Sequence, residues 1–216
     1  MARDRLGGPA RRGYGICYLN AFQTQPGTLR WWQHTHPRLL LRDAQGQLVS
    51  DPGWPGEYLF DTSSTALRAR LGAVLGRWLS RCSEDGFDAV EPDNLDAFNR
   101  SQRLLTRADN LALASILAGA HGAGLAIAQK NMAGVTPAER RRVGFGFAVA
   151  EECAVHRECG RYARTYDRRI VEVEYTDNGR SAFRRACRRH GDRWSVVLRD
   201  RLLRPAGHSA HVRREC

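Results

Sequence analysis

The chain has 216 residues, enough for one domain with a sizeable core, and it contains no apolar run long enough to span a membrane. Its formal net charge of +11 suggests an acidic partner, yet the basic residues are scattered arginines and Lys130 is the only lysine. Arginines spread in this way usually form a solvated surface, so we expect neither nucleic acid nor a membrane as a partner.

The six cysteines are many for an intracellular chain of this length. Their even number indicates disulfides and therefore an oxidising compartment. The N-terminal residues, however, show no apolar stretch typical of a signal peptide. Two explanations stay open: the cysteines remain reduced, or an export signal precedes this chain.

Residues 1–13 are basic and rich in glycine and proline, which predicts a disordered arm before one domain over residues 14–216. A short apolar run at residues 15–20 predicts a buried strand. Residues 21–55 show little periodicity and several prolines and glycines, which indicates a long loop of the kind that often carries function.

Strand-like and helical patterns alternate through the rest of the chain. The predicted strands cover residues 57–61, 89–93, 125–129, 145–151, 170–175 and 195–198. The predicted helices cover residues 64–82, 107–121, 137–142, 159–166 and 181–190. This alternation indicates βαβ units and a parallel sheet.

Polar residues stand at the end of strand after strand: Asn20, Asp93, Lys130-Asn131, Glu151-Glu152, Glu174-Tyr175 and Arg199-Asp200. A doubly wound sheet would carry a glycine-rich phosphate loop after its first strand, and none is visible. Polar groups at the same end of successive strands are instead typical of the active face of a barrel. We therefore expect an α/β fold of the (β/α)8 TIM-barrel type, incomplete, with about six of its eight strands present.

Carboxylates are crowded around the strand at residues 89–93. Glu91 and Asp93 are two residues apart and should share one face, whereas Asp88 and Asn94 should take the other. A charged turn that caps the next helix is the alternative interpretation.

Several ordered blocks of this chain resemble a known family. Gly86–Asp96 is similar to the signature of glycoside hydrolase family 114, the endo-α-1,4-polygalactosaminidases. The further similar blocks are Leu105-Thr106 with Asn110, Ala120-His121, Gly124–Asn131, Phe147–Cys153 with Cys159, and Val173–Tyr175. The resemblance covers roughly residues 14–216. It implies a TIM-barrel hydrolase, without a cofactor, that cleaves polysaccharide containing α-1,4-linked galactosamine.

The resemblance also implies that Asp93 and Glu151 are the catalytic carboxyl pair. Such pairs lie about 5–5.5 Å apart in retaining glycosidases and about 6.5–9.5 Å apart in inverting ones. By analogy with related retaining enzymes we expect Glu151 as nucleophile and Asp93 as acid/base, although the two roles can be exchanged. Neighbouring strand residues alternate faces, so Glu152 stays an alternative to Glu151. The expected substrate-binding residues are Tyr18, Asp88, Glu91, Asn94, Asp96, Lys130, Asn131, Glu152, Glu174 and Tyr175.

The family's barrel normally begins with two earlier strands and a secretion signal. We therefore expect that this chain lacks the N-terminal part of the barrel and that the full-length protein is secreted. A catalytically inactive, carbohydrate-binding remnant of such an enzyme is the alternative function.

The spacing Cys153-x-x-His156-x-x-Cys159 is loosely compatible with a zinc site, but no second Cys/His cluster lies nearby in the sequence. We expect no metal and instead a Cys153–Cys159 disulfide. Pairing Cys187 with Cys216 and Cys17 with Cys82 would complete three bridges, although the sequence alone does not fix this connectivity.

Overall fold

The computed structural model describes residues 1–216, which fold as two compact units. The first unit comprises residues 1–130 and 141–145, and the second comprises residues 131–140 and 146–216. The chain passes from one unit to the other three times, once within the helix α4 (Pro137–Val143).

The first unit is built on parallel strands that pair in chain order, so that each strand end lies beside the next. Tyr18 stands opposite Glu91, and Asn20 stands opposite Asp93. The strands are β1 (Ala2–Asp4), β2 (Ile16–Asn20), β3 (Ala89–Asp93) and β4 (Ala126–Lys130). This register brings the polar residues that end β2 and β3 side by side.

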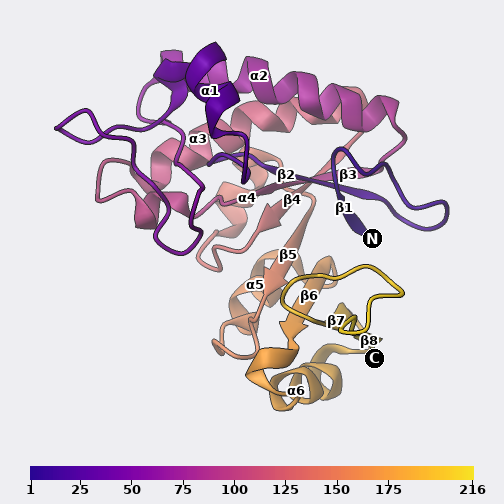
Figure 1. Ribbon diagram of the computed structural model, residues 1–216. Helices are drawn as coiled ribbons and strands as arrows, with labels where there is room; N and C mark the ends of the chain where they lie inside the picture. The colour runs from indigo at the N-terminus through magenta and orange to yellow at the C-terminus, as the bar shows by residue number, and fades with distance from the viewer. The chain divides into compact units, whose positions relative to one another are not determined.

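Two long helices pack against each other in this unit, α2 and α3 (Figure 1). Ser64 caps α2 by accepting a hydrogen bond from the Leu67 N–H, and Thr106 forms a capping box with Asp109 at the start of α3. The helices of the unit are α1 (Leu29–Thr35), α2 (Thr65–Glu84) and α3 (Arg107–Leu117), with 3-10 turns η1 (Pro37–Leu39), η2 (Ala97–Arg100) and η3 (Ala118–Ala123).

The second unit repeats the strand–helix alternation. Its parallel strands are β5 (Phe147–Glu151), β6 (Ile170–Tyr175) and β7 (Ser195–Arg199), and the short β8 (Arg213–Glu215) pairs antiparallel with β7. Its helices are α5 (Cys159–Tyr166) and α6 (Ser181–His190), with the 3-10 turn η4 (Thr176–Asn178). Each helix packs on the strands that flank it in sequence, which is the arrangement of βαβ units.

Disulfides join Cys17 to Cys82, Cys153 to Cys159 and Cys187 to Cys216. The bridge between Cys153 and Cys159 is the one that we expected, and the other two are the pairings that the sequence left open. The first ties β2 to α2, and the second closes the loop between β5 and α5. The third fastens the C-terminal residue to α6. Each bridge lies within one unit.

The sequence-based fold class is confirmed: the protein has the α/β fold of an incomplete TIM barrel, and the six predicted strands with polar ends are β2 to β7. The prediction of a strand at residues 57–61 is wrong. Residues 58–60 make only isolated bridges, to Gln23, Leu40 and Ser50. Because these partners come from separate turns of a long loop, no ladder extends along the segment.

Two further segments differ in detail from the prediction. The helix predicted to continue to residue 121 passes at Ala118 into the 3-10 turn η3. The arm at residues 1–13 contains the strand β1, in which Ala2 pairs with Ile16. The domain boundary expected at residue 14 stays a prediction.

Candidate functional site

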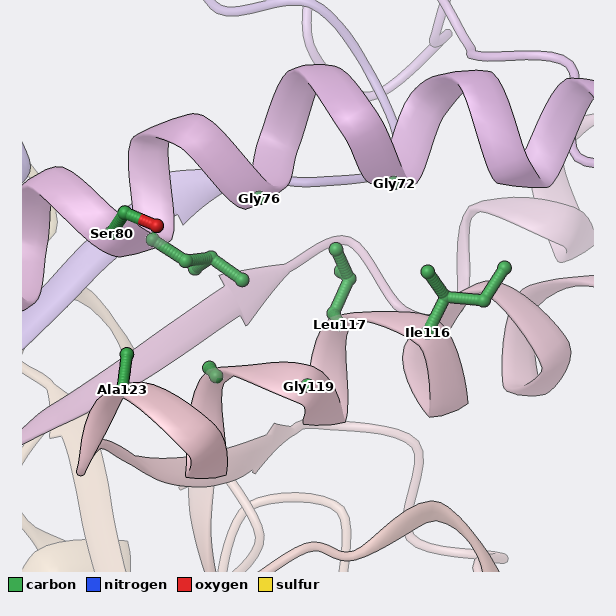
Figure 2. A pocket seen from close by; sticks show the side chains of 9 residues that line it. Gly72, Gly76, Ser80, Ile116, Leu117, Gly119 and Ala123 are labelled. Atoms are coloured by element: carbon green, nitrogen blue, oxygen red, sulfur yellow. The ribbon is translucent and has the colours of Figure 1, made fainter.

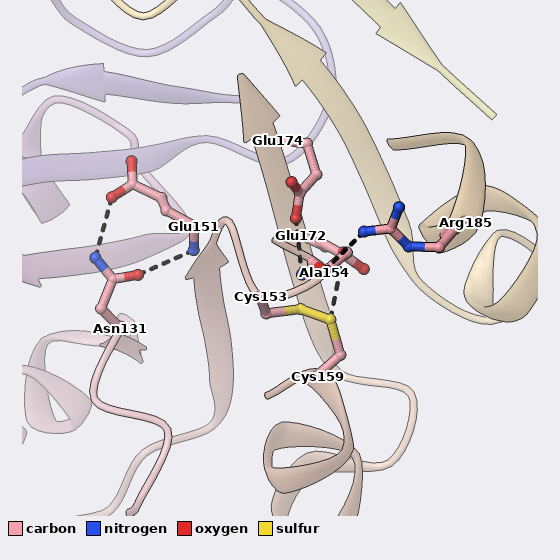
Figure 3. Close-up of a disulfide and its surroundings, with 8 residues drawn as sticks. All are labelled: Asn131, Glu151, Cys153, Ala154, Cys159, Glu172, Glu174 and Arg185. Atoms are coloured by element: carbon pink, nitrogen blue, oxygen red, sulfur yellow. Dashed lines mark hydrogen bonds between the residues drawn. A yellow bond between two sulfur atoms is a disulfide. The ribbon is translucent and has the colours of Figure 1, made fainter. Parts of the chain in front are cut away.

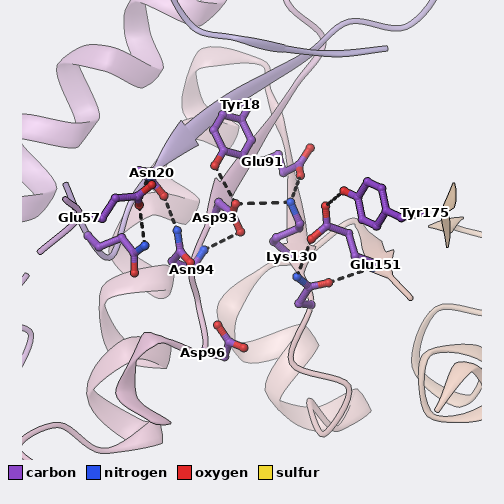
Figure 4. A network of polar contacts seen from close by, with 12 residues as sticks. Tyr18, Asn20, Glu57, Glu91, Asp93, Asn94, Asp96, Lys130, Glu151 and Tyr175 are labelled. Atoms are coloured by element: carbon purple, nitrogen blue, oxygen red, sulfur yellow. Dashed lines mark hydrogen bonds and ion pairs between the residues drawn. The ribbon is translucent and has the colours of Figure 1, made fainter. Parts of the chain in front are cut away.

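The lysine that ends β4 links two carboxylates of β3 (Figure 4). Its Nζ donates to Glu91 Oε1 at 2.7 Å and lies 3.5 Å from Asp93 Oδ2. The side chains of Lys130 and Glu91 are each 4% exposed, so this ion pair is buried. Glu91 and Asp93 both reach Lys130 because residues two apart in a strand share a face.

Tyr18 of β2 supplies a second donor to the same oxygen of Asp93. The Tyr18 hydroxyl donates to Asp93 Oδ2 at 2.8 Å. Burial raises the pKa of the Tyr18 phenol, and the charge of Asp93 raises it further, so the hydroxyl keeps its proton. The backbone N–H of Asn94 donates to Asp93 Oδ1 at 2.7 Å. Both oxygens of Asp93 are thus held in place by donors.

Glu57 also lies in this part of the structure, although the sequence did not identify it as a candidate site residue. It is buried, and its Oε2 accepts hydrogen bonds from Asn20 Nδ2 at 3.0 Å and from Gln23 Nε2 at 2.6 Å. Asn94 Nδ2 in turn donates to Asn20 Oδ1. Burial raises the pKa of Glu57, against the lowering effect of the two amides. Glu57 lies beyond a long unpatterned loop, which carries no periodicity from which its position could be predicted.

Asp96 lies beside the same cluster and is tied to Arg100. The guanidinium of Arg100 binds Asp96 Oδ1 at 3.1 Å and Asn94 Oδ1 at 3.0 Å. It also binds the buried Asp51 at 2.6 Å. We call these first-unit residues the Asp93 cluster: Tyr18, Asn20, Glu57, Glu91, Asp93, Asn94, Asp96, Arg100 and Lys130.

The structure does not bring Asp88 to the Asp93 cluster. Asp88 precedes β3, and its Oδ2 accepts the backbone N–H of Gly15 at 2.7 Å. This contact fixes the start of β2 against the start of β3, at the opposite end of the strands from Asp93. The sequence placed Asp88 near the site because it lies in the same carboxylate-rich segment.

In the second unit, Glu151 ends β5 and is held by two neutral donors (Figure 4). Asn131 Nδ2 donates to Glu151 Oε2 at 3.0 Å, and Asn131 Oδ1 accepts the Glu151 backbone N–H at 2.9 Å. The Tyr175 hydroxyl donates to Glu151 Oε1. This reciprocal pair with Asn131 fixes the orientation of the carboxyl group.

The neighbouring Glu152 is engaged in a different way. Arg201 binds its two oxygens at 2.6 and 3.0 Å, and Asn178 donates to it as well. Hydrogen bonds from Arg201 lower the pKa of Glu152. The same guanidinium lies 4.1 Å over the ring of Tyr175. Glu152 is therefore held by a positive charge, and Arg201 also helps to position the tyrosine that contacts Glu151.

Glu174 lies away from Glu151 and faces the Cys153–Cys159 disulfide together with Glu172 (Figure 3). Both glutamates are buried, and Glu174 Oε1 accepts the Ala154 backbone N–H at 2.9 Å. Burial raises the pKa of both carboxyl groups. Adjacent residues of β6 point to opposite faces of the sheet, so Tyr175 contacts Glu151 and Glu174 lies on the other face.

Hydrolytic chemistry fits the side chains at these strand ends. Asp93 and Glu151 each end a strand in a network of donors, and the other members of the two networks are groups that bind hydroxyls or amines. No helix of the structure has both the length and the apolar character that crossing a membrane requires.

Comparisons with known proteins agree with this chemistry. The model of glycoside-hydrolase family GH114 matches residues 9–216. The crystal structure of Aspergillus fumigatus Ega3 in complex with galactosamine is 24% identical, with a TM-score of 0.70, over 94% of this chain and 78% of that one. The glycoside hydrolase domain of PelA from Pseudomonas aeruginosa is 17% identical, with a TM-score of 0.62, over 91% and 82% of the two chains. No curated protein matches the chain.

Proposed function

Because the chain belongs to glycoside-hydrolase family GH114, we propose that it cleaves galactosamine-containing polysaccharide and that Asp93 and Glu151 supply the two catalytic carboxyl groups. The observation that carries this proposal is the position of both residues at strand ends, each inside a donor network. Glycosidases of most families require one such pair at the scissile bond.

The charge of the Asp93 cluster supports an amino sugar as the substrate. The chain as a whole is strongly basic, yet Glu57, Glu91, Asp93 and Asp96 gather around one lysine and one arginine. A local group of carboxylates attracts a protonated amine regardless of the net charge. Ega3, the relative whose structure is known with galactosamine, shares the fold.

The contacts favour Asp93 as the nucleophile and Glu151 as the acid/base, the reverse of the assignment made by analogy from the sequence. The ammonium of Lys130 can only donate, so the Asp93 oxygen beside it must act as an acceptor. Glu151 accepts hydrogen bonds from Asn131 and Tyr175, and we assign it the complementary acid/base role.

In this mechanism an Asp93 oxygen attacks the anomeric carbon as Glu151 gives its proton to the departing glycosidic oxygen. The bond from the anomeric carbon to that oxygen breaks, and a glycosyl ester forms on Asp93. Water then attacks the anomeric carbon, Glu151 takes the water proton, and the bond from that carbon to Asp93 breaks, which releases Asp93 as a carboxylate. Two inversions give net retention of configuration.

The other cluster residues bind and orient in this proposal. Tyr18 and Lys130 hold Asp93, while Asn131 and Tyr175 hold Glu151. Glu57, Asn94 and Asp96 are the groups that we assign to sugar hydroxyls and the amine. Glu152 and Glu91 serve as ion-pair partners of Arg201 and Lys130 rather than as direct contacts to the sugar.

The test is turnover of partially deacetylated α-1,4-polygalactosamine by the full chain. Asp93→Asn and Glu151→Gln should each lower cleavage by at least about a thousandfold, because each removes one of two obligatory groups. The matched control is Asp88→Asn, whose carboxyl group binds Gly15 away from the cluster and which should retain near-native turnover. Near-native rates for Asp93→Asn or Glu151→Gln would refute the assignment, and an inactive wild type would favour a binding remnant.

We further propose that the protein works outside the cell. Its three disulfides would not persist in a reducing cytosol. Non-reducing mass spectrometry of protein recovered from the culture medium should find all six cysteines paired.

A further inference from the structure

A buried carboxyl pair that the proposed hydrolysis does not use lies against the Cys153–Cys159 disulfide (Figure 3). Glu172 is 0% exposed and Glu174 is 1% exposed. Glu172 Oε1 lies 3.5 Å from the Cys159 sulfur, and Oε2 of both glutamates is buried without a hydrogen-bond partner. A buried carboxyl group with an unpartnered oxygen beside two sulfurs is a candidate set of metal ligands.

Three potential ligand atoms lie close enough together to reach one ion once the disulfide is reduced. One ligand atom each from Cys153, Cys159 and Glu172 all lie within 4.8 Å of one another. Zinc bonds of about 2.3 Å to sulfur and 2.0 Å to oxygen place those two atoms about 3.5 Å apart on a tetrahedron. The distance from Cys159 Sγ to Glu172 Oε1 is 3.5 Å.

The loop that carries the cysteines also has support that does not depend on the disulfide. The Glu158 N–H donates to the Cys153 carbonyl, and the His156 N–H donates to the Glu152 carbonyl, both at 2.9 Å. Cys159 is the first residue of α5, where the helix dipole favours a thiolate. The Cα atoms of Cys153 and Cys159 lie 4.8 Å apart, close enough for both sulfurs to bind one ion after reduction.

We propose that the reduced chain binds one zinc ion through Cys153, Cys159 and Glu172, with water as the fourth ligand, so that either the metal or the disulfide can close the loop between β5 and α5. A phosphine or dithiol reductant supplies two electrons, and two protons complete the thiols. Zinc binding then releases both thiol protons. Two thiolates, one carboxylate and one water around a divalent ion form a donor set that zinc accepts.

The experiment uses the full chain, reduced with a phosphine under anaerobic conditions and titrated with Co²⁺ as a spectroscopic probe for Zn²⁺. The wild type should show thiolate-to-cobalt charge transfer and tetrahedral ligand-field bands that saturate at one equivalent and disappear when Zn²⁺ is added. A Cys153→Ser/Cys159→Ser double variant measures any cobalt that the other four cysteines bind.

Glu172→Gln should weaken cobalt binding at least tenfold while the count of free thiols stays the same. Glu158→Gln, next to Cys159 but outside the ligand set, should bind like the wild type. In addition, Zn²⁺ should slow reoxidation of the wild-type disulfide but not that of Glu172→Gln.

Two results would overturn the proposal: a wild-type signal no larger than that of the double-serine variant, or undiminished binding by Glu172→Gln. If Glu172→Gln does not fold, X-ray absorption at the zinc edge of the wild type decides. Two sulfur and two oxygen ligands support the site, and any other sulfur count contradicts it.

Discussion

Lys130 is the one lysine of the chain, and its ammonium group forms ion pairs with two carboxylates of β3, Glu91 and Asp93. Removing one partner of a buried ion pair leaves the other charge without compensation, which is far more costly than removing both partners. At the residue scale, the Asp93 cluster therefore couples stability to catalysis through a single ammonium group.

Lys130→Met should destabilise the protein by about 3–5 kcal/mol, because Glu91 stays buried without its cation. The double variant Lys130→Met/Glu91→Gln should recover a large part of that loss and remain inactive, because Asp93 still lacks the ammonium. Urea unfolding and turnover, measured on both variants, test this. Equal stability of the wild type and the single variant would show that the pair has no structural role.

The helices α2 and α3 and the turn η3 line an open pocket of about 230 Å³, in which most of the lining residues are small (Figure 2). Close approach of the helices depends on one glycine in particular. A Cβ at Gly72 would lie 2.5 Å from Ile116 Cγ2, whereas a Cβ at Gly76 meets nothing within 4 Å. At the scale of the element, two glycines one turn apart in α2 therefore differ: Gly72 is needed for the contact with α3, and Gly76 is not.

Gly72→Ala should lower the free energy of unfolding by about 1–3 kcal/mol, because the β-branched Ile116 has little rotamer freedom in a helix. Gly76→Ala should raise it by about 0.5–1 kcal/mol through helix propensity. Chemical denaturation of the two variants gives both numbers. The same sign for the two changes would contradict the packing described.

The strand β6 makes stability depend on pH. The folded-state pKa of Glu172, about 8, lies above its ordinary value of 4.5. Protonation therefore favours the folded state, and this contribution is fully present below about pH 4.5 and is lost as the pH rises through 8. The melting temperature of the wild type should fall across that window more steeply than that of Glu172→Gln. Parallel curves for the two proteins would exclude Glu172 as the source, and Glu158→Gln is the control.

At the scale of the whole molecule, the chain combines a net charge of +11 with carboxylates gathered at strand ends. The sequence predicted the alternation of strands and helices because apolar periodicity and capping residues such as Ser64 and Thr106 are local signals. It also predicted that Asp93 and Glu151 end strands. These parts of the fold and of the site depend on short-range patterns.

Other parts depend on contacts between distant residues, which no local pattern encodes. Glu57 meets Asn20 only because a long loop folds back on β2, and β1 exists only through its pairing with β2. Asp88 was misplaced for a related reason, since a shift of a few residues along a strand moves a side chain from one end of the sheet to the other. The sequence did not show which face of β6 Glu174 occupies. That face follows from the contact of Tyr175 with Glu151, because adjacent residues of a strand point to opposite faces.

Attack of Asp93 on the sugar can be demonstrated by trapping the glycosyl-enzyme. The full chain would be treated with a 5-fluoro galactosaminyl fluoride, digested, and mapped by tandem mass spectrometry. We expect a single sugar adduct, on the side chain of Asp93 in the peptide that contains it. An adduct on Glu151 or any other carboxylate, or none from an enzyme that still cleaves the polymer, would contradict it.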